Sequence, residues 1–137
     1  MSDPYELAYE IDRLMRRIAA GTHAKAPEFD PERVGPLGGM VLLAIADAGT
    51  ISIQALATQM SRDKAQMTRL IQSLEAKSLL HREISDEDAR INLLELTPKG
   101  EALVVAIKHA VSEVLDEILT PLTRADRESL FEMLQRL

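Results

Sequence analysis

The 137-residue sequence contains no cysteine and no tryptophan, and it has only two tyrosines and two phenylalanines. The absence of cysteine excludes disulfide bonds, thiolate metal ligands, cysteine nucleophiles and thiol redox switches. Because aromatic residues are scarce, a hydrophobic core must be built mainly from Leu, Ile, Val, Ala and Met. The apolar fraction of 46% and the charged fraction of 28% are typical of a folded globular chain, and the length suits one domain with a substantial core.

Long apolar runs are also missing. Residues 1–18 are charged and have the spacing of an amphipathic helix, without the continuous apolar segment of a signal peptide. No stretch of the sequence is apolar over the roughly 20 residues that a membrane-spanning helix needs. We therefore expect a cytoplasmic protein with no membrane partner.

The net charge of −6 argues, taken alone, against a nucleic-acid partner. However, residues 52–100 contain seven basic and seven acidic residues, whereas the rest of the chain contains nine basic and fifteen acidic ones. Residues 61–82 carry five basic and only two acidic residues. Charges more than about 8–10 Å away are largely screened at physiological salt, so a phosphate backbone would respond to this local excess. A mixed-charge surface with chance clustering is the alternative.

Hydrophobic spacing and the positions of Gly and Pro predict six helices and a β-hairpin. In chain order we expect a helix from Asp3-Pro4 to Gly21, a loop over 21–39, a buried helix over 40–48, a short strand at 51–53, helices at 53–59 and about 62–77, strands at 80–84 and 91–97, and helices at 97–119 and 123–137. We expect Ser61 to cap the helix over 62–77 and Asp63 to lie in its first turn. The order predicts a mainly α fold with a small β wing, a winged helix-turn-helix.

The helix over 62–77 has two contrasting faces. Its apolar stripe, which must face a core, consists of Met67, Leu70, Ile71 and Leu74. The opposite face has no carboxylate and carries Ala65, Arg69, Gln72 and Ala76, flanked by Gln66, Thr68 and Ser73. Arginine suits guanine edges, glutamine suits adenine edges, and Ala or Thr methyl groups suit the thymine methyl. An ordinary polar helix surface is the alternative.

The tip of the predicted hairpin, residues 85–90, carries three acidic residues, Asp86, Glu87 and Asp88, followed by Arg90. The acidic residues fit a solvated turn, or a turn in which Asp88 pairs with Arg90 and orients it. An arginine on a projecting loop is well suited to a narrow minor groove. A calcium loop starting at Asp86 is excluded, because its sixth residue is Ile91 rather than Gly.

Three segments resemble a known family. Residues 53–80 resemble the helix-turn-helix of MarR-type regulators, and the segments 88–90 and 96–100 (Asp-Ala-Arg, then Leu-Thr-Pro-Lys-Gly) resemble that family's wing signature, Asp-x-Arg followed by Leu-Thr-x-x-Gly. The resemblance is close over residues 44–100 and looser outside them, and Ser78 stands where the family usually has Gly.

The resemblance implies a homodimer whose first and last helices interlock. It also implies that the helix over 62–77 enters the major groove and that Arg90 enters the adjacent minor groove, at palindromic sites. Many members respond to a small-molecule effector that binds between the dimer helices and the DNA-binding lobe.

These patterns predict a winged helix-turn-helix domain over residues 36–100, with its recognition helix at about 62–77 and its wing at about 80–97. The dimerisation helices are expected within residues 1–35 and 101–137. The predicted DNA-binding residues are Ser61, Arg62, Lys64, Ala65, Gln66, Thr68, Arg69, Gln72 and Arg90, with Asp88 orienting the wing. The predicted dimer contacts are Leu7, Ile11, Leu14, Ile107, Val111, Val114, Ile118, Leu130 and Leu134.

Catalytic motifs are missing from the sequence. The three histidines, His23, His81 and His109, are scattered, and there is no nucleophile elbow or phosphate-binding loop. His109 and Glu113 lie one helical turn apart, but two ligands do not make a metal site. We therefore expect no enzyme, cofactor or metal, but a prokaryotic regulator that binds double-stranded DNA as a homodimer and acts as a repressor. A winged helix that binds protein instead of DNA is the alternative.

Overall fold

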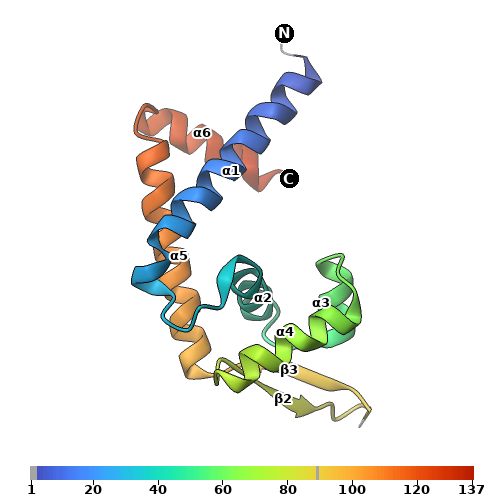
Figure 1. Cartoon of the computed structure of the whole chain (residues 1–137). Coiled ribbons are helices and arrows are strands. Elements are labelled where there is room, and N and C mark those ends of the chain that lie inside the picture. Colours follow the sequence, from blue (N-terminus) through green and yellow to red (C-terminus); the bar gives the residue numbers. More distant parts are fainter. Residues whose placement is uncertain (1–2, 89) are drawn as a thin grey trace. The chain divides into compact units, whose positions relative to one another are not determined.

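The computed structural model describes residues 3–88 and 90–137, so Ala89 of the wing signature lies outside the described residues. The described part folds into six helices and a three-stranded sheet, which confirms the mainly α fold with a small β wing (Figure 1). In chain order the elements are α1 (Pro4–Phe29), α2 (Gly35–Ala48), β1 (Ile51–Ser52), α3 (Ile53–Gln59), α4 (Lys64–Ala76), β2 (Leu80–Ile84), β3 (Asn92–Leu96), α5 (Pro98–Ile118) and α6 (Arg124–Gln135).

Residues 26–108 form a compact unit that contains most of the hydrophobic core. The strands pair in the antiparallel order β1-β3-β2, with Leu80 opposite Leu96 and Ile51 opposite Leu94. Within this unit α4 packs beside α3 and β2 (Figure 1). Aliphatic side chains and one methionine fill the centre of this unit, as the scarcity of aromatic residues requires. These buried side chains are Val41, Leu42, Ile45, Leu56, Met67, Ile71, Leu74, Leu79, Leu80, Leu94, Leu96, Leu103, Val104 and Ile107.

The turn between α3 and α4 corrects the predicted helix cap. Asp63, and not Ser61, is the N-cap of α4, because its backbone is extended and its carboxylate accepts a hydrogen bond from the Ala65 N–H at 3.3 Å. Ser61 instead adopts a left-handed conformation with φ of 52°, which turns the chain between the two helices. Helix α4 therefore begins at Lys64, two residues later than predicted.

The predicted end of the first helix at Gly21 and the predicted loop over 21–39 are both wrong. Helix α1 continues through Gly21 to Phe29. The glycine allows Val114 to approach the helix closely, since a Cβ there would lie 2.7 Å from Cγ1 of Val114. The connection is short, and Asp30 accepts hydrogen bonds from the backbone N–H groups of Val34 and Gly35 at the start of α2. Glycines inside a helix can thus mark packing rather than termination.

The second unit consists of the described residues up to Lys25 together with His109–Leu137. Helix α6 starts with a capping box, in which the Thr123 hydroxyl accepts from the Asp126 N–H and the Asp126 carboxylate accepts from the Thr123 N–H. The Lys25 ammonium donates to Glu113 at 3.2 Å, and this hydrogen bond, with the charge of Lys25 and then of His109, holds the pKa of Glu113 below its usual value. The unit buries few large apolar side chains.

None of the helices among the described residues combines the length and apolarity needed to cross a membrane.

Candidate nucleic-acid interface

Helix α4 presents the predicted recognition face outward. Its buried side chains are Met67, Ile71 and Leu74, and these fix the rotation of the helix about its axis. Eight of the nine predicted DNA-binding residues are exposed, and Thr68 is half-buried, with its hydroxyl donating to the Lys64 carbonyl at 2.8 Å. The structure therefore brings the predicted α4 residues onto one accessible surface.

Three cations stand at the start of this surface. Among residues 3–88 and 90–137, no carboxylate lies within ion-pair distance of Arg62, Lys64 or Arg69. Arg82, by contrast, is paired with Glu75 at 3.2 Å on another side of α4. The local positive charge thus gathers at the N-terminal half of α4, where the helix dipole adds to the attraction for an anion.

The tip of the wing holds a two-pronged ion pair. The Arg90 guanidinium donates to both oxygens of Asp88, with Nε to Oδ1 at 3.1 Å and Nη2 to Oδ2 at 3.0 Å. These hydrogen bonds hold the pKa of Asp88 below its usual value, so the pair persists as pH falls until that lowered pKa is reached. The Arg90 side chain is 91% exposed, so its position is fixed by Asp88 and not by burial. The Ser85 hydroxyl accepts hydrogen bonds from the backbone N–H groups of Glu87 and Asp88 and supports the turn.

The end of α4 is tied directly to the beginning of α5. Ser78 adopts a left-handed conformation with φ of 62°. The MarR-type sequences that this chain resembles usually have Gly at this position. The Thr97 hydroxyl donates to the Ser78 carbonyl at 2.6 Å and accepts from the Gly100 N–H at 3.0 Å, and the Thr97 N–H donates to the Leu79 carbonyl. A Cβ at residue 100 would lie 2.0 Å from that Leu79 carbonyl oxygen, so only glycine fits there.

The predicted dimer contacts fall into two groups. Leu7, Ile11 and Leu134 are exposed, and Leu14, Val111, Ile118 and Leu130 are half-buried. Ile107 and Val114 are already buried within the single chain, which favours a role in internal packing. Further large apolar side chains that the sequence analysis did not select are exposed in the same unit: Tyr5, Tyr9, Met15, Phe131, Met133 and Leu137.

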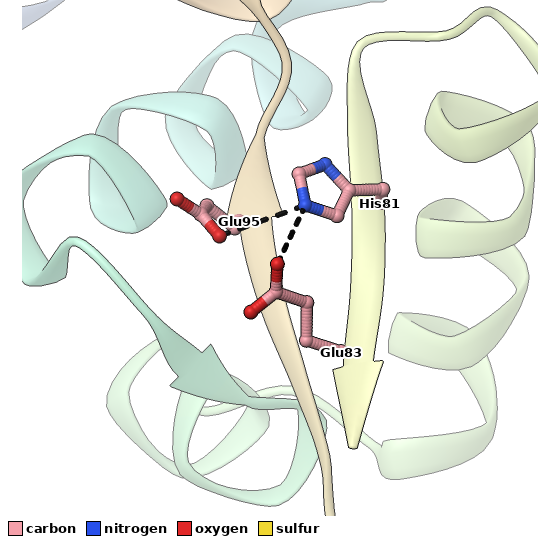
Figure 2. Close-up of side chains that lie close together, drawn as sticks. All are labelled: His81, Glu83 and Glu95. Carbon is pink, nitrogen blue, oxygen red and sulfur yellow. Dashed lines mark hydrogen bonds and ion pairs between the residues drawn. The ribbon is translucent and has the colours of Figure 1, made fainter. Parts of the chain in front are cut away.

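One cluster on the wing sheet was missed because each of its residues has an ordinary explanation when read alone. His81 on β2 lies opposite Glu95 on β3, and Glu83 follows two residues along on the same face of β2 (Figure 2). The His81 Nε2 atom lies 3.3 Å from a Glu83 oxygen and 3.5 Å from a Glu95 oxygen. The spacing His-x-Glu on a strand, with a second Glu at the cross-strand position, was the available signal.

Comparison with known proteins decides the family. The sequence profile of the MarR family matches residues 39–91. A Thauera aromatica protein assigned to transcriptional regulation of the hcr operon is 32% identical over 133 residues, which cover 96% of this chain and 78% of that protein. This chain belongs to the MarR family.

As a MarR-family member the protein is a transcriptional regulator and not an enzyme, as expected from the sequence. Apo wild-type MarR from E. coli is 21% identical with a TM-score of 0.80, and the match covers 99% of this chain and 96% of that one. The repressor CouR, solved on a 23-mer DNA duplex, is 26% identical with a TM-score of 0.73, covering 95% of this chain and 90% of CouR. The structural similarity to these two proteins therefore extends over nearly the whole length of this chain.

Proposed function

We propose that this MarR-family regulator binds duplex DNA in a sequence-specific manner through α4 and the β2–β3 wing. The observation that carries the proposal is the exposed face of α4, which combines three cations free of carboxylate partners in the described chain with side chains suited to base edges. The DNA-bound structure of CouR adds support from a relative of the same fold.

The roles follow from position on the helix. Ser61, Arg62 and Lys64 stand at the turn and the first residue of α4, where contacts to phosphates are expected to set the register. Ala65, Gln66, Thr68, Arg69 and Gln72 then read base edges in the major groove. Arg90, oriented by Asp88, reaches the adjacent minor groove. Residues 36–100 form the DNA-binding domain in this proposal, and residues 1–35 and 101–137 provide the dimerisation helices.

We also propose that the regulator is a homodimer built from the exposed apolar side chains of its first and last helices. Helices α1 and α6 expose Leu7, Ile11, Phe131 and Leu134, and α6 has no buried side chain at all. A monomeric protein rarely exposes so many large apolar groups in one unit, and an isologous interface with a second copy would bury them. Two copies related by a two-fold axis read palindromic sites.

The remaining elements of the proposal come from the family. CouR is described as a repressor, which supports repression by this regulator as well. Release by a small-molecule effector is proposed on the family resemblance, with no residue assigned to the effector. A cytoplasmic location follows from the proposed chromosomal target.

The test compares two arginines of similar exposure. Arg90→Ala removes the wing cation, and Arg124→Ala removes a 94% exposed arginine on α6 that lies 3.5 Å from a Glu128 carboxylate oxygen. We expect the fluorescence anisotropy of a labelled operator to show weaker binding by Arg90→Ala only, with a salt slope near −0.9 per phosphate contact in the parent protein. Equal losses in both variants, or binding without a salt slope, would contradict the proposal and favour the protein-binding alternative.

The dimer is tested by placing a charge on each of two similarly exposed apolar residues. Leu134 on α6 is 57% exposed and Met40 on α2 is 58% exposed. Analytical ultracentrifugation should show Leu134→Glu shifted toward monomer and Met40→Glu unchanged. A dimer that survives Leu134→Glu with the parent affinity would show that α6 lies outside the interface.

A further inference from the structure

The wing sheet holds three potential metal ligands at positions fixed by strand register. His81 and Glu95 are paired across β2 and β3, and residues two apart on one strand share a face, so Glu83 joins them. Figure 2 shows the His81 Nε2 atom facing one carboxylate oxygen of Glu83 and one of Glu95. Within residues 3–88 and 90–137, no other set of three His, Asp or Glu side chains gathers its ligand atoms within 4.8 Å.

The spacing of the ligand atoms matches that of a tetrahedral metal centre. Zinc binds histidine nitrogen and carboxylate oxygen at about 2.0–2.2 Å, so neighbouring ligand atoms of a tetrahedral site lie about 3.3–3.6 Å apart. The His81 Nε2 atom lies 3.3 Å and 3.5 Å from the two carboxylate oxygens. A small rotation of the exposed glutamate side chains brings the two Glu oxygens to the same distance from each other, since all three ligand atoms already lie within 4.8 Å of one another.

The charge of the cluster is unbalanced. In the described part of the chain, neither Glu83 nor Glu95 has a lysine or arginine within ion-pair distance, and His81 is the only basic side chain that contacts them. A protonated imidazole supplies one positive charge for two carboxylates, whereas a divalent cation bound to the neutral imidazole supplies two. The side chains are partly exposed, so an ion has a direct path of entry and room for water as a fourth ligand.

We propose that His81, Glu83 and Glu95 form a site for a divalent transition-metal ion on the wing, with Zn²⁺ as the probe. The mixed nitrogen and oxygen donors suit zinc better than calcium or magnesium, which prefer oxygen alone. The His109–Glu113 pair, with 2.7 Å between Nε2 and Oε1, offers only two ligands on one helix and is the natural control. The proposal concerns the protein without DNA and does not depend on the proposed function.

The experiment is zinc titration of the untagged full-length protein by isothermal titration calorimetry in a non-coordinating buffer. We expect one zinc ion per chain at this site. His81→Ala should weaken that binding by at least about tenfold, Glu83→Gln and Glu95→Gln should each weaken it, and His109→Ala should leave it unchanged. Circular dichroism verifies that each variant keeps the parent fold.

A second measurement follows the ligand atom directly. Long-range nitrogen–proton NMR spectra of the imidazoles should show the Nε2 resonance of His81 shifting with zinc at the stoichiometry found by calorimetry. The proposal is overturned if the parent protein gives no saturable binding, if His81→Ala binds zinc as tightly as the parent, or if the His81 ring resonances do not respond to zinc. The cluster would then be only a set of contacts between the His81 imidazole and two glutamates.

Discussion

Replacing Gly100 by alanine should separate the start of α5 from the segment that follows α4. An added Cβ would lie 2.0 Å from the Leu79 carbonyl oxygen and 3.0 Å from its carbon. The backbone at residue 100 or at Leu79 must therefore shift by about 1 Å or more to restore an ordinary contact distance between the Cβ and that oxygen. That carbonyl also accepts the Thr97 N–H at 3.1 Å, so the shift weakens hydrogen bonds as well as packing.

The magnitude follows from the interactions at this junction. Besides the Thr97 N–H bond, the Thr97 hydroxyl donates to the Ser78 carbonyl at 2.6 Å and the Lys99 ammonium donates to the Lys77 carbonyl at 3.0 Å. A net value of about 1 kcal/mol for each bond gives an expected loss of about 2–4 kcal/mol in the free energy of unfolding.

The matched control is Gly39→Ala, since Gly39 is also a buried helical glycine. A Cβ there would lie 3.5 Å from Cδ1 of Ile107, an ordinary van der Waals contact. We expect this variant to be unchanged or more stable by up to about 1 kcal/mol. Urea unfolding followed by circular dichroism, at one protein concentration, measures both variants. Equal stability of Gly100→Ala and the parent protein would refute the close approach of α5 to Leu79.

Three further predictions concern α4, the turn after it and the wing. Ser78→Gly relieves a left-handed serine and should raise the free energy of unfolding by about 1 kcal/mol in the same urea assay, and a lower stability would contradict the turn geometry. Asp63→Ala removes the observed cap and should cost about 1 kcal/mol, whereas Ser61→Ala should cost less, and the reverse order would restore Ser61 as the cap. Arg90→Ala should raise the pKa of Asp88 toward the ordinary value of an aspartate, as carboxyl ¹³C titration can measure, and an unchanged pKa would mean that the pair does not form in solution.

The sequence predicted the elements that depend on local spacing. The apolar stripe containing Met67, Ile71 and Leu74 placed α4 and its exposed face correctly, because a 3.6-residue period can be read directly from the sequence. Thr97 and the proline after it marked the start of α5, and the structure shows the Thr97 hydroxyl accepting from Gly100.

The sequence failed where a residue's role depends on a distant partner. Gly21 was interpreted as a helix end, although it is glycine because Val114 approaches it closely. Ser61 and Asp63 are both good capping residues two positions apart, and only the left-handed backbone at Ser61 decides between them. The His81–Glu95 neighbourhood likewise depends on strand register, which local composition does not specify.

The central claim is sequence-specific DNA binding by the outward face of α4. The most direct measurement is selection of bound duplexes from a random library with the purified protein and, in parallel, with its Gln72→Ala variant. The account predicts two inverted half-sites whose centres lie about one helical turn apart, roughly 10–10.5 base pairs or a multiple of this, with relaxed preference at one position of each half-site for the variant. No enriched sequence, or the same preferences with both proteins, would contradict it.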